Sequence, residues 1–201
     1  MNVCFMKNIP RFPTLRILDT ELEMTDCVKI LGVLVSADLK WDKYVDHIYH
    51  KANSKMFMLK LLKKFKLPIT DLLTVYKGYI RPLMEYATPV WNVGLTKAHV
   101  GKLESIQKRA LKIILGSEYS GYELALTKCS LVSLQSRRRD LCSDFAAKLK
   151  SSNTFHKWLP QPRLSQVQYQ LRNASNLSTL ACKTKRYQNS PIPYFVSLLN
   201  H

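Results

Sequence analysis

The sequence predicts a mainly α-helical protein with a β-hairpin near its N-terminus, a helical bundle after it and an irregular C-terminal tail. Between residues 41 and 150, apolar residues recur every three or four positions, the spacing of a buried helix face. Two β-rich runs precede these segments, and a stretch rich in Gln, Ser, Asn and Pro follows them. We therefore expect four regions: an irregular N-terminus (1–14), a β-hairpin (15–36), a helical domain (37–158), and a linker with a C-terminal tail (159–201).

The N-terminal part begins with Pro10 and Pro13, which prevent a regular helix there. Residues 15–18 and 28–35 are β-rich runs separated by an acidic connection, so we expect them to pair as one hairpin. The second run is apolar on both faces, and this pattern is typical of a strand that is covered on both sides. We expect a neighbouring domain to cover it.

A long helix is predicted over residues 41–65. Its buried stripe is formed by residues spaced by three or four: Val45, Ile48, Ala52, Met56 and Leu59. Pro68 ends this helix, and Thr70 is the predicted cap of the next one. That second helix carries a further apolar set: Leu72, Leu73, Tyr76, Tyr79, Ile80 and Leu83. Pro82 and Pro89 bracket residues 81–92, which predicts broken helix and turn.

Three further helices follow. Thr96 is the predicted cap of a helix that ends at Leu115, before Gly116, with an apolar stripe of Leu103, Ile106, Ala110 and Ile113. Residues 122–127 predict a short helix. Residues 134–150 predict a longer one, with Leu141, Phe145 and Leu149 facing inward. From residue 160 to about 179 we expect a loose linker, and residues 186–195 regain enough apolar content to dock as a tail.

The chain is strongly basic, with 31 Lys and Arg against 14 Asp and Glu, a formal net charge of +17. Such a balance favours a polyanionic partner, because cations that neutralise phosphates release counterions. We favour DNA or RNA, although charge alone does not distinguish them from an anionic membrane or from a basic surface without a partner. No apolar run is long enough for a transmembrane helix, and the first residues lack the apolar core of a signal peptide. The five scattered cysteines include no CxxC pair, so we expect reduced thiols in an intracellular protein, in nucleus or cytoplasm.

Candidate phosphate contacts lie on three predicted helices. They are Lys51, Lys55, Lys60, Lys63, Lys64, Lys66, Lys102, Lys108, Arg109, Lys112, Arg137 and Arg138. The alternative is that the lysines form ordinary solvated helix faces, and for them we favour phosphate contact. Nearby aromatic residues would stack on unpaired bases if exposed, but we favour core positions for them: Phe57, Phe65, Tyr76 and Tyr79.

The three arginines Arg137, Arg138 and Arg139 lie near the start of a predicted helix. Positive charge at a helix N-terminus opposes the helix dipole and costs free energy. A phosphate from a partner would relieve that cost, which is why we include Arg137 and Arg138 among the candidates.

Catalytic motifs are missing from the sequence. Nucleotidyl transfer needs clustered Asp residues to hold two metal ions, and the sequence contains no adjacent Asp pair. Asp38, Asp42 and Asp46 are spaced by four, but capping and solvation explain them better than metal binding. His47 and His50 lack a third ligand, and no Gly-rich phosphate loop or GxSxG elbow is present. We expect no catalytic residue, metal or cofactor, and no enzyme activity from this chain alone.

Several ordered blocks resemble the region that follows the polymerase active site in reverse transcriptases of LINE-type (non-LTR) retrotransposons. The blocks are VKILGV at 28–33, LKW at 39–41, KAN at 51–53, LLKKF at 61–65, YKGYIRPLMEYATPVW at 76–91, LESIQKRA at 103–110 and RYQNSPIPY at 186–194. Ile30 stands where that family usually has an aromatic residue. The resemblance implies a thumb-like helical region that grips the template–primer duplex, and it implies palm and fingers domains as partners.

A second resemblance concerns residues 26–61, which are similar to a short domain named after the N-terminus of an AlkB-type repair protein with methyltransferase activity. This resemblance implies 2-oxoglutarate-dependent dioxygenase or methyltransferase activity. The sequence contains neither the iron-binding triad of the first nor the Gly-rich S-adenosylmethionine loop of the second. Three hypotheses therefore stand: a truncated reverse-transcriptase region that binds nucleic acid non-specifically through basic helices, a protein carrying the AlkB-linked domain, and a non-functional transposon remnant.

Overall fold

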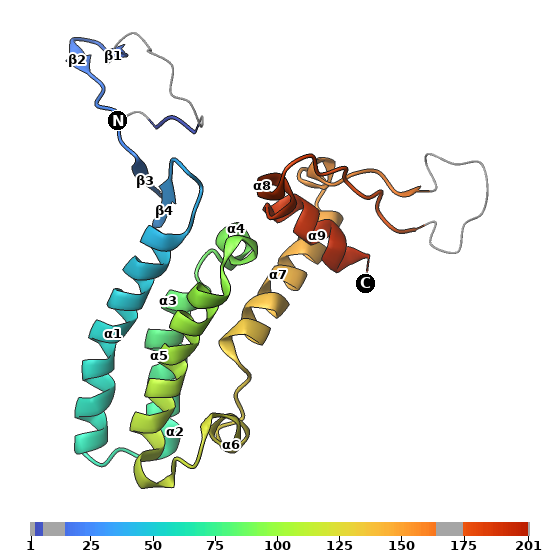
Figure 1. Cartoon of the computed structure of the whole chain (residues 1–201). Coiled ribbons are helices and arrows are strands. Elements are labelled where there is room, and N and C mark those ends of the chain that lie inside the picture. Colours follow the sequence, from blue (N-terminus) through green and yellow to red (C-terminus); the bar gives the residue numbers. More distant parts are fainter. Residues whose placement is uncertain (1–2, 6–14, 164–174, 201) are drawn as a thin grey trace.

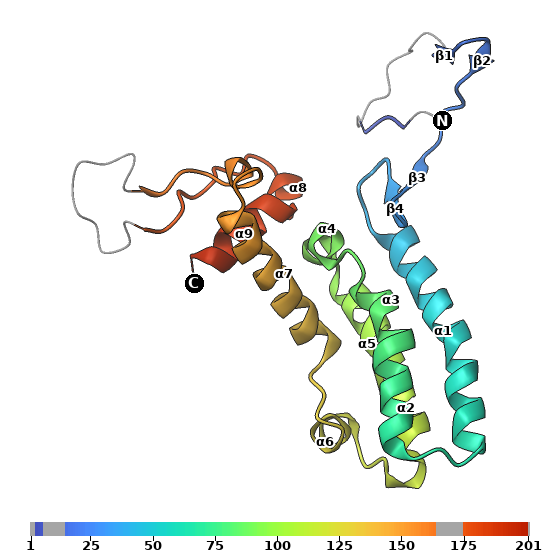
Figure 2. The same cartoon turned by 180° about the vertical axis from the view of Figure 1, so that it is seen from behind.

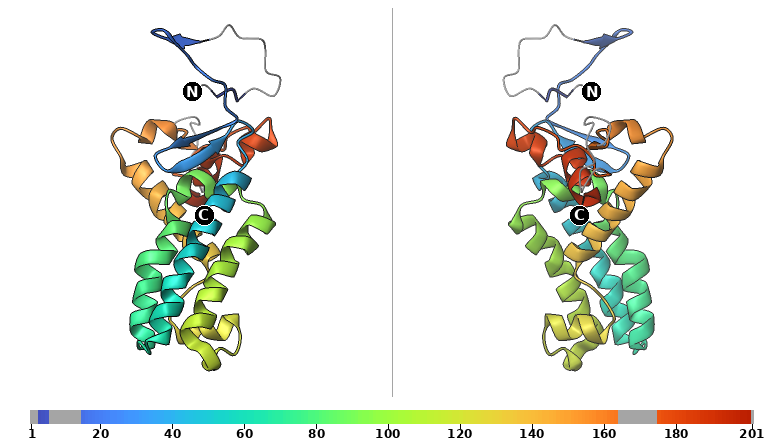
Figure 3. Two further views of the ribbon diagram at one scale, coloured as in Figure 1. Left: turned by 90° about the vertical axis from the view of Figure 1, so that its left-hand side faces the viewer. Right: turned by 90° about the vertical axis from the view of Figure 1, so that its right-hand side faces the viewer.

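The computed structural model describes residues 3–5, 15–163 and 175–200, and it is mainly helical, as predicted. Four helical segments run side by side in alternating directions and form a bundle (Figure 1). In chain order they are α1 (Asp42–Lys64), the joined elements α2 (Ile69–Val75), η1 (Tyr76–Ile80) and α3 (Arg81–Glu85), α5 (Lys97–Leu115), and α7 (Leu134–Ser151). The N-terminal strands and the C-terminal helices lie at one end of this bundle, and α6 (Tyr122–Lys128) lies at the other (Figure 3).

The N-terminal part forms two hairpins rather than one. β1 (Arg16–Ile17) pairs with β2 (Thr20–Glu21), and β3 (Cys27–Ile30) pairs with β4 (Val33–Ser36). The predicted pairing of residues 15–18 with 28–35 is therefore wrong. The first run pairs instead with the residues just after it, and the second run folds back on itself, each through a two-residue turn. Such local pairing closes a shorter loop and loses less chain entropy. Leu18 and Leu31 adopt positive φ at these turns.

The second hairpin is partly covered by the described part of this chain. Val33 is buried against the bundle, and Leu34 and Val35 pack partly on it. Ile30, the cross-strand partner of Val33, and Leu31 in the turn are exposed. The neighbouring domain that we expect on both faces of this run stays a prediction.

Helix α1 agrees with its predicted range to within one residue at each end. All five residues of its predicted stripe are buried: Val45, Ile48, Ala52, Met56 and Leu59. The predicted cap of the next helix is wrong, because α2 begins at Ile69 with Pro68 at the cap position. Thr70 lies inside the first turn, where its hydroxyl donates to Asp71 (3.3 Å).

Residues 81–92 are broken helix and turn, as predicted. Pro82 has no N–H, so it cannot continue an α-helical ladder, and the π-helix η1 precedes it. Ala87 then adopts a left-handed conformation (φ +51°) and reverses the chain before α4 (Thr88–Trp91). The indole of Trp91 donates to the carbonyl of Tyr86 (2.8 Å) and closes this joint.

The later helices also follow their predicted ranges. The hydroxyl of Thr96 accepts the N–H of His99 (3.2 Å) and caps α5, while Gly116 ends it at positive φ. The predicted inward face of α7 is partly wrong: Leu149 is buried, but Phe145 is exposed. The face that α7 actually buries is formed by Leu134, Arg138, Cys142, Ala146 and Leu149.

The C-terminal tail contains two short helices, α8 (Lys185–Gln188) and α9 (Pro191–Leu199), and so is more regular than predicted. α9 packs across α7 with Phe195 and Val196 buried (Figure 2). Much of the predicted linker, residues 164–174, lies outside the described residues. At its two ends the chain pairs with itself, because the N–H of Ser178 donates to the carbonyl of Gln161 (3.0 Å).

Candidate nucleic-acid interface

Helices α1 and α5 carry most of the predicted phosphate contacts, and they run side by side in the same direction (Figure 1). Polar contacts join them at intervals along their whole length. From the first turn to the last they are His99 Nε2 with Asp42 Oδ1 (2.9 Å), Lys102 Nζ with Asp46 Oδ1 (2.5 Å), Arg109 Nη1 with Asn53 Oδ1 (2.6 Å), and Lys63 Nζ with the carbonyl of Ile114 (2.7 Å). These contacts fix the basic residues of α5 beside those of α1.

Charge changes along this pair of helices. At the N-terminal end the two α1 carboxylates engage His99 and Lys102, so the local charge is largely compensated. At the C-terminal end Lys60, Lys64 and Lys66 are exposed and make no ion pair with any described residue. The uncompensated positive charge therefore gathers at that end of the bundle.

The outer face of α5 adds three more cations. Arg109 lies toward α1, through its contact with Asn53. Lys108 and Lys112 lie on the other side, where their ammonium groups sit above the rings of Tyr122 (5.0 Å) and Tyr119 (5.5 Å). A cation–π contact holds an ammonium group without consuming its N–H donors. We call the six uncompensated cations the basic face: Lys60, Lys64, Lys66, Lys108, Arg109 and Lys112.

The remaining lysine candidates do not join this face. Lys63 is half-buried and donates to a backbone carbonyl, so it serves the contact between α1 and α5. Lys102 pairs with Asp46. Lys55 lies toward η1, where it contacts the hydroxyl of Tyr79 and lies 4.3 Å from the centre of that ring. Lys51, one helical turn before Lys55, is exposed.

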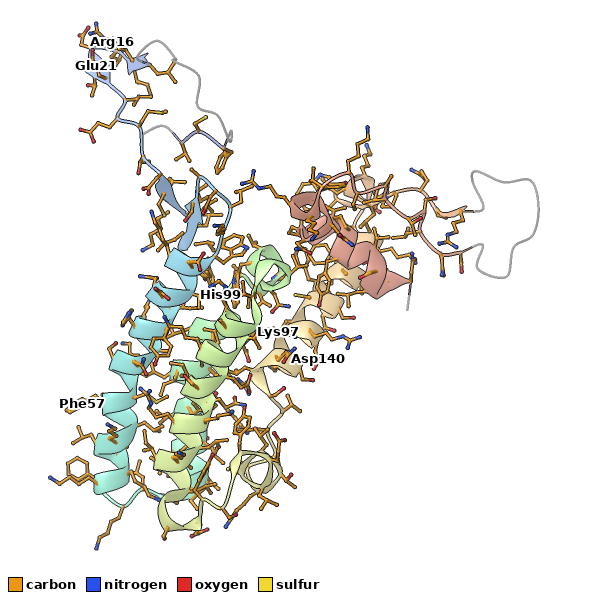
Figure 4. The ribbon with its side chains drawn as sticks, viewed as in Figure 1. Arg16, Glu21, Phe57, Lys97, His99 and Asp140 are labelled. Carbon is orange, nitrogen blue, oxygen red and sulfur yellow. The ribbon has the colours of Figure 1, made fainter. Side chains whose placement is uncertain are left out.

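The preferred core assignment of the aromatic residues is wrong for three of the four. Tyr76 is fully buried, but Tyr79 is 43% exposed, Phe65 is 68% exposed and Phe57 is 70% exposed. Phe57 projects away from the bundle (Figure 4). The apolar stripe of α1 is already complete without these residues, so Phe57 and Phe65 fall on the outer face between lysines. Exposed rings among cations suit contact with sugars or unpaired bases.

The two arginine candidates on α7 have internal roles. Arg138 is fully buried, its Nε donates to Asn92 Oδ1 (3.1 Å), and burial lowers its pKa. Arg137 Nε donates to Glu85 Oε1 (3.1 Å), a carboxylate that also pairs with Arg81. We therefore remove Arg138 from the surface candidates, and Arg137 already has a carboxylate partner.

Glu104 relieves the charge at the start of α7. Its carboxylate, on α5, accepts the N–H groups of Leu134 (3.0 Å) and Gln135 (3.2 Å) and the hydroxyl of Tyr122. A carboxylate at a helix N-terminus satisfies free N–H groups and favours the dipole. The relief that we predict from a partner's phosphate is thus supplied inside the chain, by an acid that sequence reasoning missed.

A buried polar chain extends from Glu104 into the core. The side-chain amide of Gln107 donates to the hydroxyl of Tyr122 (3.0 Å) and to the carbonyl of Val132 (2.8 Å), and the hydroxyl of Tyr76 donates to Gln107 Oε1 (2.6 Å). Burial raises the pKa of Tyr76, and burial together with the hydrogen bond to Glu104 raises that of Tyr122. Both hydroxyls therefore stay protonated and donate at neutral pH.

The spaced aspartates are engaged in structural contacts. Asp42 and Asp46 pair with α5, and Asp38 Oδ1 accepts the N–H of Lys40 (3.0 Å). Within residues 3–5, 15–163 and 175–200, no group of three or more His, Cys, Asp or Glu side chains is arranged to hold a metal ion. None of the helices in that same part of the chain is long and apolar enough to cross a membrane.

The fold and the basic face define a basic helical module with an apolar core that contains one buried polar chain. Over 120 residues, 59% of its length, the chain is 27% identical to a curated Drosophila melanogaster protein described as a probable RNA-directed DNA polymerase from transposon X-element. The matched region spans 13% of that polymerase. This similarity supports a region related to a transposon reverse transcriptase. No family model matches the chain, and no solved structure matches it.

Proposed function

We propose that this chain is the thumb-like, C-terminal region of a LINE-type reverse transcriptase and that its basic face binds the backbone of a template–primer duplex. The observation that carries the proposal is a set of six cations on, or just after, two helices that are fixed side by side. None of the six has an acidic partner among the described residues. Five of the six are lysines, which act as point charges for phosphates and read no base edge. Binding is therefore expected to be indifferent to sequence.

In this proposal the module supplies affinity and not polymerase chemistry. The sequence has no adjacent Asp pair, and its three spaced aspartates are already engaged. Palm and fingers domains of a polymerase are the proposed protein partners, and the exposed Ile30 and Leu31 of the second hairpin are the proposed contact with them.

The alternatives gain no support from a specific feature. The AlkB-linked hypothesis needs an iron or S-adenosylmethionine site, and the described residues offer no three-ligand cluster. If the chain is a transposon remnant without a role, the basic face should bind DNA no more tightly than other basic surfaces of the chain. A binding measurement with matched variants therefore separates it from the first proposal.

The test is fluorescence anisotropy with a short blunt DNA duplex over a range of salt concentrations. We expect the affinity to fall by about 10³-fold between 50 and 200 mM salt, because several phosphates are neutralised. The triple variant Lys60→Gln/Lys64→Gln/Lys112→Gln should lower the slope of log K against log salt by about 2 to 3. The matched control, Lys29→Gln/Lys183→Gln/Lys185→Gln, removes the same charge from exposed positions elsewhere.

The two triple variants decide the proposal. Equal weakening by both would mean that net charge, and not the basic face, drives binding. Arg138→Met serves as a further control, because a fully buried guanidinium should not affect affinity for DNA. Absence of binding to the duplex even at low salt would refute the proposal.

A further inference from the structure

An apolar groove lies beside the C-terminal half of α7, where α4, α7, η4 (His156–Trp158) and α9 meet. It has a volume of about 530 Å³, and its walls are almost entirely carbon: Val90, Phe145, Leu149, Trp158, Ile192 and Phe195 contribute to them. Trp158 forms one edge and is 60% exposed. A tryptophan this open to solvent, beside a groove of this size, marks a binding surface.

The turn that carries Trp158 combines aromatic and basic side chains. The rings of Phe155 and Trp158 pack with centroids 5.0 Å apart and an interplanar angle of 59°, and Phe155 is 46% exposed. Lys148, Lys150 and Lys157 are exposed in the same stretch, and residues 148–158 contain no acid. An anionic ligand with a flat apolar part therefore complements both the charge of the turn and the surface of the groove.

We propose that this groove takes one unpaired nucleotide, with its base against Trp158 and its phosphate near Lys157 or Lys148. Aromatic platforms flanked by cations bind single strands in this way, because every base has a π-face and every nucleotide a phosphate. Lys148 and Lys157 are exposed and adjacent in sequence to the lining residues Leu149 and Trp158. A purely apolar protein segment would gain nothing from these charges, so they favour the nucleotide.

The chemistry of the walls sets the specificity. A base that is paired within a duplex keeps its faces stacked on its neighbours and cannot enter, so the site selects unpaired nucleotides. The groove offers almost no polar group to read a base edge, so the base is held by its face and its identity matters little. The site therefore differs in substrate from the basic face, which is proposed to bind duplex backbone. The nucleotide site depends on the proposed function in one respect: both sites take a nucleic acid as their ligand.

The test compares three DNA probes by fluorescence anisotropy: a blunt duplex, the same duplex with a single-stranded tail, and the same duplex with a tail of abasic sites. We expect the normal tail to tighten binding by about tenfold through base stacking. The abasic tail keeps the phosphates but lacks bases, so it should give little of this gain. Trp158→Ala should remove the gain and leave blunt-duplex affinity unchanged, while Trp158→Phe should retain part of it.

Tryptophan fluorescence gives a second readout. Trp91 is fully buried and Trp41 is half-buried, so Trp158 is the tryptophan most open to a base. A base stacked on Trp158 should quench part of the protein's tryptophan fluorescence, and this quenching should be absent from Trp158→Phe. Equal gain from the abasic tail, or a gain that survives Trp158→Ala, would overturn the nucleotide site. No gain and no quenching would also overturn it. Failure of the proposed duplex binding is seen separately, with the blunt probe.

Discussion

Among the six glycines, Gly94 has the least room for a side chain. A Cβ atom at this position would lie 2.4 Å from Nε1 and 2.6 Å from Cδ1 of Trp41, whose ring packs beside Tyr44 at the start of α1. Glycine is thus required here by space and not by backbone conformation. We expect Gly94→Ala to lower the free energy of unfolding by about 1–3 kcal/mol, because the indole must move out of a packed position.

Urea unfolding followed by circular dichroism measures this change, and Gly101→Ala is the matched control. Gly101 lies inside α5, and a Cβ there would meet nothing within 4 Å. Alanine has the higher helix propensity, so this variant should gain about 0.5–1 kcal/mol. If Gly94→Ala unfolded at the same urea concentration as the native protein, the inference that Trp41 leaves no room for a Cβ atom at Gly94 would be wrong.

Prediction from the sequence failed most often for the exposure of individual side chains. Arg138 reads as a surface cation in a basic triplet, yet it packs over Trp91 and bonds Asn92, partners more than 45 residues earlier in the chain. No local sequence pattern predicts that contact. Phe57 and Phe65 fail in the opposite sense: aromatic character predicts burial, but their positions on α1 lie off the buried stripe. Helical position decides exposure there, and residue type does not.

At the scale of elements, the start of α7 depends on Glu104 of a different helix. Replacing this carboxylate by an amide removes the negative charge that interacts with Arg138 and weakens the bonds to Leu134 and Gln135. We expect Glu104→Gln to cost about 1–2 kcal/mol, the usual worth of a charged cap. Glu123→Gln, an exposed change on α6, should cost almost nothing.

Native-state hydrogen exchange provides the specific measurement for Glu104→Gln. Faster exchange should be concentrated in the first turn of α7, where the two N–H groups lose a charged acceptor. Uniform loss of protection over all helices would show instead that the polar chain from Glu104 to Tyr76 supports the whole bundle as one unit.

Helix positions were predictable because they depend on local periodicity, caps and prolines: α1, α5 and α7 begin and end within one or two residues of their predicted bounds. Strand pairing was not predictable in the same way. The two turns, at residues 18–19 and 31–32, each begin with a leucine at positive φ, a residue type that gives no turn signal, and Gly32 lies inside an apolar run that reads as one continuous strand. The lysines of the basic face were named from the sequence, but their arrangement required the contacts between α1 and α5.

For the whole molecule, buried tyrosines predict a loss of stability in alkaline solution. Burial raises the pKa of Tyr44 from 10.0 to about 12, and burial also raises the pKa values of Tyr76 and Tyr122. Below pH 10 these groups are neutral in the folded and the unfolded chain, so their contribution is fully present. Above that pH the unfolded chain releases protons that the folded chain retains, and stability falls as pH rises toward the folded-state pKa.

Each such tyrosine contributes a slope of about 1.4 kcal/mol per pH unit through this window. Tyr44→Phe removes one group from the titration, so its unfolding free energy should fall less steeply between pH 10 and 12 than that of the native protein. Between pH 7 and 10 the difference in unfolding free energy between the two proteins should not change with pH. Urea midpoints measured across this range check the prediction, with Tyr187→Phe, an exposed change on α8, as the control. Parallel curves for Tyr44→Phe and the native protein would mean that Tyr44 titrates normally and that its ring is open to water in the folded chain.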